Sequence, residues 1–183
     1  LIFQFSHGSL GSANTHYTGR FSKNAPGIIG NSLILALLVG GALTWIVISQ
    51  ADRILPLIYP QVDTYLVRLA VISMTALFLL DYFNSIVRGQ DRIARFSFTL
   101  AARELFFVII ILVLFTTDSI SVTNSVVSWL VVAIVVSLYA FWSAWSGMQF
   151  RMKPDFELWK VMARYSAKAH TANLSSFLRM RLH

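Results

Sequence analysis

Residues 28–49 read IIGNSLILALLVGGALTWIVIS, a run without a charged side chain. A helix of roughly 20 apolar residues, at about 1.5 Å per residue, crosses a hydrocarbon core of about 30 Å. The run is therefore long enough to span a membrane. Gly40 and Gly41 near its middle predict either a bend or close packing against another helix, and close packing is the commoner explanation.

Three further stretches of similar apolar character follow along the chain, at residues 64–87, 96–116 and 123–146. The last has no charged residue, whereas the first carries Arg68 and Asp81 and the second carries Arg103 and Glu104. Short connections rich in proline, glycine or polar residues separate the stretches, which makes successive helices antiparallel neighbours. The predicted fold class is all-α, a polytopic transmembrane helix bundle.

The overall composition agrees with this fold class. Hydrophobic residues make up 56% of the 183 residues and charged residues 13%, with a mean hydropathy of +0.66, which is too apolar for a soluble domain of this length. The net charge of +7 is divided into short groups between apolar runs, so no continuous basic face is expected to bind nucleic acid. Cysteine is absent, which excludes a disulfide framework and a cysteine-based metal site.

The basic residues between the stretches predict sidedness. One set of connections holds nine positive charges and the other set holds Arg53 alone. Positively charged connections remain in the cytoplasm, so we expect the first set there. That set consists of Arg20, Lys23, Arg88, Arg92, Arg95, Arg151, Lys153, Lys160 and Arg164.

Charged residues inside the second and third stretches are candidates for a functional role. Asp81 precedes Arg88 by seven residues and Arg103 follows Arg95 by eight, which places both about 10–12 Å inside the cytoplasmic end. An isolated charge in hydrocarbon costs about 2.5–3.5 kcal/mol or more, so we predict that Asp81 and Arg103 form a pair. Glu104 is the neighbouring alternative, but it points about 100° away from Arg103. The pair is either a structural clamp or a proton- or ion-coupled switch in a central cavity.

Residues 155–183 predict a further helix that either lies on the membrane surface or enters the bilayer. A polar stripe on one face consists of Lys168, Thr171, Ser175, Arg179 and His183. One interpretation is an amphipathic surface helix. The other is the cationic wall of an aqueous cavity, where Arg179 and Arg181 meet an anionic ligand, because planar guanidinium groups match two phosphate oxygens at once.

Catalytic patterns are missing from the sequence. The four histidines, His7, His16, His170 and His183, lack the spacing to one another or to carboxylates that metal sites need. No glycine-rich loop of the kind that cradles phosphate is present. We therefore expect neither an enzyme activity nor a metal or other cofactor.

Three regions resemble one known family. They are residues 11–17 (GSANTHY) with 30–35 (GNSLIL), residues 86–92 (IVRGQDR), and residues 165–170 (YSAKAH) with Asn173, Leu174 and 177–182 (FLRMRL). Together they resemble the polysaccharide transporter branch of the multidrug, oligosaccharidyl-lipid and polysaccharide exporter superfamily, the O-antigen and capsule repeat-unit flippases. The sequence departs from that family at His183, where members usually have aspartate.

The resemblance implies a two-lobed exporter fold with about 12–14 helices in the full protein and alternating access between the lobes. Residues 1–150 would then hold first-lobe transmembrane helices, from part of helix 2 through helix 6. Residues 151–183 would be a cytoplasmic linker and the start of helix 7 of the second lobe. The chain would be an incomplete first lobe in a bacterial inner membrane, with the loops that carry Arg20, Arg88, Arg92 and Arg151 in the cytoplasm.

The function implied by the resemblance is flipping of undecaprenyl-diphosphate-linked oligosaccharide repeat units during synthesis of polysaccharide such as the O-antigen of lipopolysaccharide. The implied partners are the lipid bilayer, the lipid-linked oligosaccharide, and a polysaccharide polymerase and ligase. Alternatives are a cation-coupled multidrug exporter of the same superfamily and a non-transporting membrane component of glycan assembly. The candidate residues of the substrate cavity are Lys168, Arg179, Arg181 and His183, and the intramembrane charges are Asp81, Arg103 and Glu104.

Overall fold

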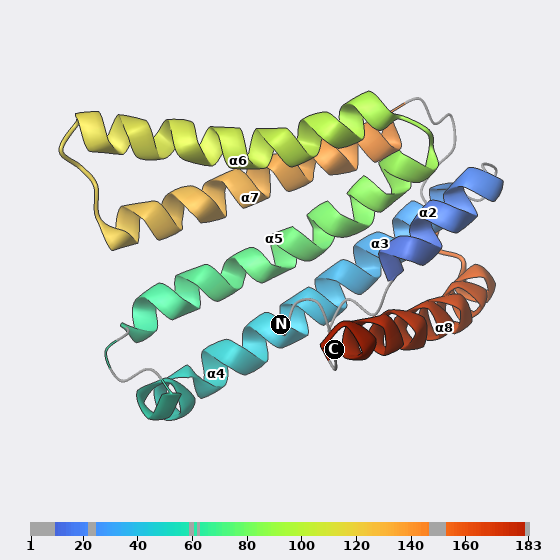
Figure 1. Cartoon of the computed structure of the whole chain (residues 1–183), viewed down its shortest axis with the longest axis horizontal. Coiled ribbons are helices and arrows are strands. Elements are labelled where there is room, and N and C mark those ends of the chain that lie inside the picture. The colour runs from blue at the N-terminus through green and yellow to red at the C-terminus, as the bar shows by residue number, and fades with distance from the viewer. Residues whose placement is uncertain (1–9, 22–24, 59–60, 62, 147–152, 182–183) are drawn as a thin grey trace.

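The computed structural model describes residues 10–21, 25–58, 61, 63–146 and 153–181, without the side chains of residues 54–58 and 172–181. The regular structure of these residues is entirely helical, which confirms the predicted all-α bundle (Figure 1). In chain order the elements are α2 (Leu10–Arg20), α3 (Ala25–Leu35), a π-helical segment (Ala36–Gly40), α4 (Gly41–Ile58), α5 (Thr64–Gly89), α6 (Ile93–Thr116), α7 (Val122–Trp145) and α8 (Phe156–Arg181).

Within the described residues, four helices are long and apolar enough to cross a membrane, and they coincide with the four predicted stretches. The first is continuous through α3, the π-helical segment and α4, and it is slightly longer than predicted at both ends. The helix α8 is equally long, but it does not belong to this group. The four helices cover Ala25–Arg53, Thr64–Gly89, Ile93–Thr116 and Val122–Trp145.

The central element of the bundle is α5, which packs against α2, α4 and α7. Its buried residues Phe83, Ile86 and Val87 form a core with Val136 and Ala140 of α7. By contrast, α6 packs mainly on α7 and buries only Thr99 and Ala102 among its described residues. Most other residues of α6 are apolar, and many of them are exposed, as expected for a helix that faces lipid.

Glycine permits one close helix contact inside the first span. A Cβ atom on Gly40 would lie 2.9 Å from the Thr75 Cα of α5, so only glycine fits there without a shift. Gly41 has open space around it. The side chain of Thr44, one turn onward, donates to the Val71 carbonyl oxygen at 3.2 Å. The close-packing explanation is therefore confirmed for Gly40.

Two tight turns make α5, α6 and α7 antiparallel. Asp91, after α5, has φ 59° and its amide donates to the Arg88 carbonyl at 3.0 Å, while the Arg92 amide donates to the Val87 carbonyl at 3.2 Å. This is a Schellman motif, which satisfies carbonyl groups that a helix end otherwise leaves without partners. Asp118, with φ 49°, forms the same motif after α6.

The helix α8 lies beside α2 and α3 (Figure 1). Two hydrogen bonds fix its beginning. The Asn31 side-chain amide donates to the Asp155 backbone carbonyl at 2.7 Å, and the Asp155 backbone N–H donates to Asn31 Oδ1 at 3.0 Å. Further along, Met162 and Ser166 are buried, and the Tyr165 ring stacks on His16 of α2 at 4.9 Å. These contacts determine which face of α8 points away from the bundle.

Candidate functional site

The outward face of α8 carries a row of basic side chains. Lys160, Arg164 and Lys168 follow one another at every fourth residue and are exposed. Since residues four apart lie on the same side of a helix, the three form a row roughly 12 Å long, which we call the α8 cationic row. Lys160 is bonded to Glu157 at 2.7 Å. Arg164 and Lys168 have no such carboxylate among the residues that the structure describes.

The predicted polar stripe overlaps this row in part. Lys168 and Thr171 are exposed, and the Thr171 hydroxyl donates to the Lys168 carbonyl at 2.8 Å. The predicted stripe began at Lys168, whereas the exposed cations begin two turns earlier, at Lys160. Spacing alone would have shown this, because Lys160 and Arg164 continue the same interval. The backbones of Ser175, Arg179 and Arg181 belong to α8, but their side chains lie outside the described residues, and so does all of His183.

The structure corrects the predicted pairing of Asp81 with Arg103. Arg103 donates to Glu104 Oε1 through Nε at 2.9 Å and through Nη2 at 2.5 Å, and its guanidinium lies 5.6 Å from the Trp129 ring centre. Asp81 instead faces α2, where its Oδ2 lies 3.5 Å from the position of a Cβ on Gly11. Adjacent residues diverge by about 100° at Cβ, but the long side chains of Arg103 and Glu104 bend sideways and close that gap.

A buried polar network joins α2, α3 and α5. The Asn14 amide group donates to the Tyr82 carbonyl at 3.3 Å and accepts from the Ser32 hydroxyl at 3.2 Å. The Thr15 hydroxyl donates to the Ser85 carbonyl at 3.0 Å. Sequence reasoning missed this network, although Ser32 within a largely apolar helix was a signal for it. Its hydrogen bonds are satisfied within the protein, so its role is to fix these helices together.

Basic residues close the end where α5, α6 and α7 meet. Arg92 Nη1 donates to the Ser143 carbonyl at 2.7 Å, and Gln90 donates to the Ala144 carbonyl at 2.9 Å. These bonds cap the last turn of α7. Arg92 Nη1 also lies 3.1 Å from Ser146 Oγ, and Arg95 donates to the same hydroxyl. Burial, and then the neighbouring charge of Arg95, lower the pKa of Arg92.

An ion pair also joins α4 to α5 toward the other end of the bundle. Arg68 Nη2 lies 2.6 Å from Asp52 Oδ2, and the two side chains are 40% and 69% exposed. By the predicted stretches, Arg68 lies within residues 64–87, whereas Asp52 lies in the connection after residue 49. Asp52 was missed as a partner because α4 continues to Ile58.

No family model matches this chain. No curated protein and no solved structure matches it either.

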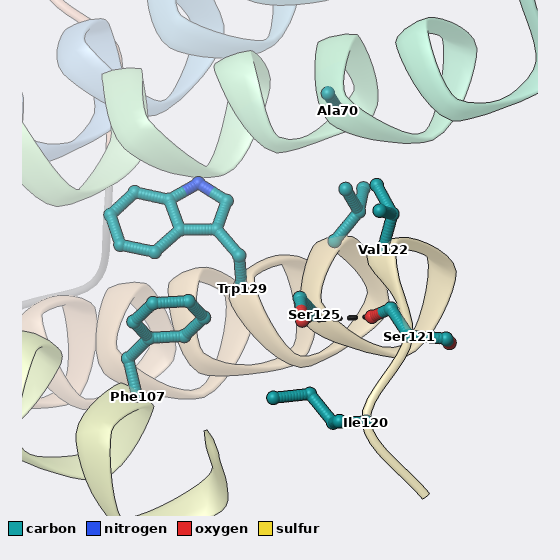
Figure 2. A pocket seen from close by; sticks show the side chains of 8 residues that line it. Ala70, Phe107, Ile120, Ser121, Val122, Ser125 and Trp129 are labelled. Atoms are coloured by element: carbon teal, nitrogen blue, oxygen red, sulfur yellow. Dashed lines mark hydrogen bonds between the residues drawn. The ribbon is translucent and has the colours of Figure 1, made fainter. Parts of the chain in front are cut away.

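An apolar crevice separates α5 from α7 near the α6–α7 turn. It is an open hollow of about 470 Å³, and Figure 2 shows the Trp129 side chain between the two helices, with Phe107 of α6 beside it. Two serines also line it, but the Ser125 hydroxyl donates to the Ser121 carbonyl and the Ser121 hydroxyl accepts from the Asn124 amide. Both hydroxyls serve the start of α7, so the crevice presents mainly apolar surface.

Proposed function

We propose that this chain is the first-lobe part of a transporter that flips undecaprenyl-diphosphate-linked oligosaccharide repeat units across a bacterial inner membrane by alternating access. Four antiparallel helices able to span a membrane are the scaffold that this function requires. The observation that carries the proposal is the α8 cationic row, which points away from the bundle while the opposite face of α8 is buried.

The α8 cationic row needs water or anions in front of it. The helix α8 runs alongside α2 and α3 (Figure 1). Its row of positive charges therefore extends along the side of the bundle, starting at the end where α8 begins. Charges facing hydrocarbon would be costly, which favours an aqueous cavity on this side. A diphosphate group fits such a surface because the Arg164 guanidinium can bind two phosphate oxygens at once. Lys168 adds a second positive charge on a flexible side chain.

The regions that resemble the flippase family meet in space. Residues 11–17 lie in α2, residues 86–92 include the α5–α6 turn, and residues 165–170 lie in α8. A Cβ on Gly89 would lie 2.6 Å from the Thr15 carbonyl oxygen. The next residue of α2, His16, stacks on Tyr165 of α8. Three loosely similar stretches far apart in sequence thus form one contiguous unit, which supports the resemblance.

The rival proposal of a cation-coupled drug exporter requires a carboxylate that is available to a cationic drug or a coupling ion. Glu104 is bonded to Arg103, and Asp81 lies against α2. The exposed charged side chains described on α8 are three basic residues and Glu157, a balance that suits an anionic cargo better than a cationic drug.

The proposal is tested by reversing one charge of the row in the full-length protein. Lys168→Glu should slow the flipping of a fluorescent polyprenyl-diphosphate sugar in proteoliposomes by about tenfold or more, since it replaces attraction with repulsion. Lys153→Glu is the matched control, because Lys153 is exposed but precedes α8. Equal rates for Lys168→Glu and wild type, at equal protein amounts, would remove the row from the mechanism, and a wild-type protein that flips no such lipid would refute the function.

A further inference from the structure

We propose that Arg92, Arg95, Trp142 and Ser146 form a binding site for the phosphate of an anionic phospholipid headgroup. The site lies where α6 begins and α7 ends, and we call it the arginine pair site. It is separate from the α8 cationic row and does not depend on the proposed transport function.

Two guanidinium groups converge on one hydroxyl at this site. Arg92 and Arg95 both bond to Ser146 Oγ, and the Arg95 guanidinium lies 5.5 Å from the Trp142 ring centre. A guanidinium has five N–H donors, and Arg95 uses one of them in a hydrogen bond within the described residues. Donors therefore remain for a ligand.

Fold stability accounts more fully for Arg92 than for Arg95, whose structural contacts are the Trp142 ring and one hydroxyl. Arg92 caps α7 through the Ser143 carbonyl, whereas Arg95 reaches a hydroxyl that Arg92 already contacts. Among the residues that the structure describes, no carboxylate forms an ion pair with either arginine. Two like charges around one hydroxyl repel each other, and an anion between them would turn that repulsion into attraction.

The surroundings favour a lipid as the source of that anion. Trp142 is 55% exposed, as expected for an aromatic side chain at a membrane interface. From it a row of aromatic rings continues along the α6–α7 pair, with Tyr139 at 5.7 Å from Trp142 and Phe98 at 5.3 Å from Tyr139. Phe98 is 51% exposed. A phospholipid can place its phosphate at the arginines and its acyl chains along these rings, which a free phosphate ion cannot do.

The test uses the full-length protein in detergent and native mass spectrometry with added phosphatidylglycerol or phosphatidylcholine. The wild type should bind phosphatidylglycerol more tightly. Arg95→Gln should weaken that binding by about fivefold, the contribution of one arginine near an anionic membrane surface. Arg95→Lys should keep most of it, and Arg53→Gln, an exposed arginine outside the site, should bind as the wild type does.

Three results would overturn the site. They are wild-type affinity for phosphatidylglycerol in Arg95→Gln, equal wild-type affinity for the two lipids, and displacement of the lipid by millimolar inorganic phosphate, which would assign the arginines to a free anion. If Arg95→Gln does not fold, the headgroup comparison in the wild type and the Arg95→Lys variant still decide the matter. Loss of lipid binding together with normal flipping would leave the transport proposal intact.

Discussion

The two ends of the α5–α7 pair are held in different ways. Near the α5–α6 turn the helices are joined by hydrogen bonds from Gln90 and Arg92 to the last carbonyls of α7. Near the α6–α7 turn they are separated by the crevice around Trp129 (Figure 2). We call these the closed end and the open end. Hydrogen bonds with defined geometry hold the closed end in one arrangement, whereas the apolar contacts at the open end are less directional.

At the closed end, α5 also packs closely against α2. Gly89→Ala would place a Cβ 2.6 Å from the Thr15 carbonyl oxygen and 2.9 Å from Thr18 Cβ, so the helices must separate. We expect a loss of about 2–3 kcal/mol in the free energy of unfolding, typical of overpacking. Titration of the full-length purified protein with a denaturing detergent, followed by circular dichroism, measures this.

Gly41→Ala is the control, because nothing lies within 4 Å of its added Cβ. It should be neutral or stabilise the helix by up to about 1 kcal/mol, since alanine favours helix more than glycine does. Equal effects of the two substitutions would show that α2 and α5 are not in close contact at Gly89.

Hydrogen bonds at the closed end should matter more than the ion pair between α4 and α5. Arg92→Gln leaves the Ser143 carbonyl without its charged donor and should cost about 1.5–3 kcal/mol. Arg68→Gln breaks an ion pair whose side chains are 40% and 69% exposed, so it should cost less than about 1 kcal/mol. Unfolding midpoints of both variants at low and high salt provide the comparison. A larger loss of stability for Arg68→Gln than for Arg92→Gln would show that the ion pair is the stronger interaction.

The sequence was sufficient to predict the spans, because length and apolar content are properties of each segment alone. It predicted the wrong partner for Arg103, because whether Arg103 faces Asp81 of α5 depends on how α6 is rotated about its axis. Apolar residues occur on every side of α6 itself, so its hydrophobic pattern does not show which side packs inward. The two residues that it buries, Thr99 and Ala102, are small and give no distinct sequence signal. The orientation of α5 toward α2 depends on small residues such as Ser85 and Gly89, whose role appears only when both helices are present.

For the candidate cavity residues, too, the sequence predicted one property and left another to the folded structure. The helical spacing of Lys168, Arg179 and His183 predicted a shared face; of these three, Lys168 has a described side chain, and it is exposed. Which side of α8 points outward, however, is determined by Asp155, Met162 and Tyr165, through contacts with α2 and α3. A periodic pattern gives the angular separation between residues but not the direction of the helix face in the folded protein.

The open end should depend on Trp129 more than on any single hydrogen bond. Its ring meets Phe107 edge-on at 5.3 Å and lies below the Arg103 guanidinium. Trp129→Leu removes both contacts and should cost about 1–2 kcal/mol, from an aromatic pair and a cation–π contact. Trp45→Leu is the matched control, because Trp45 is 71% exposed and should change stability little. If Trp129→Leu leaves the unfolding midpoint unchanged, the aromatic contacts do not hold α6 and α7 at this end. The crevice would then be held by the α6–α7 turn, through the Asn124 side chain that donates to the Ser119 carbonyl at 2.7 Å.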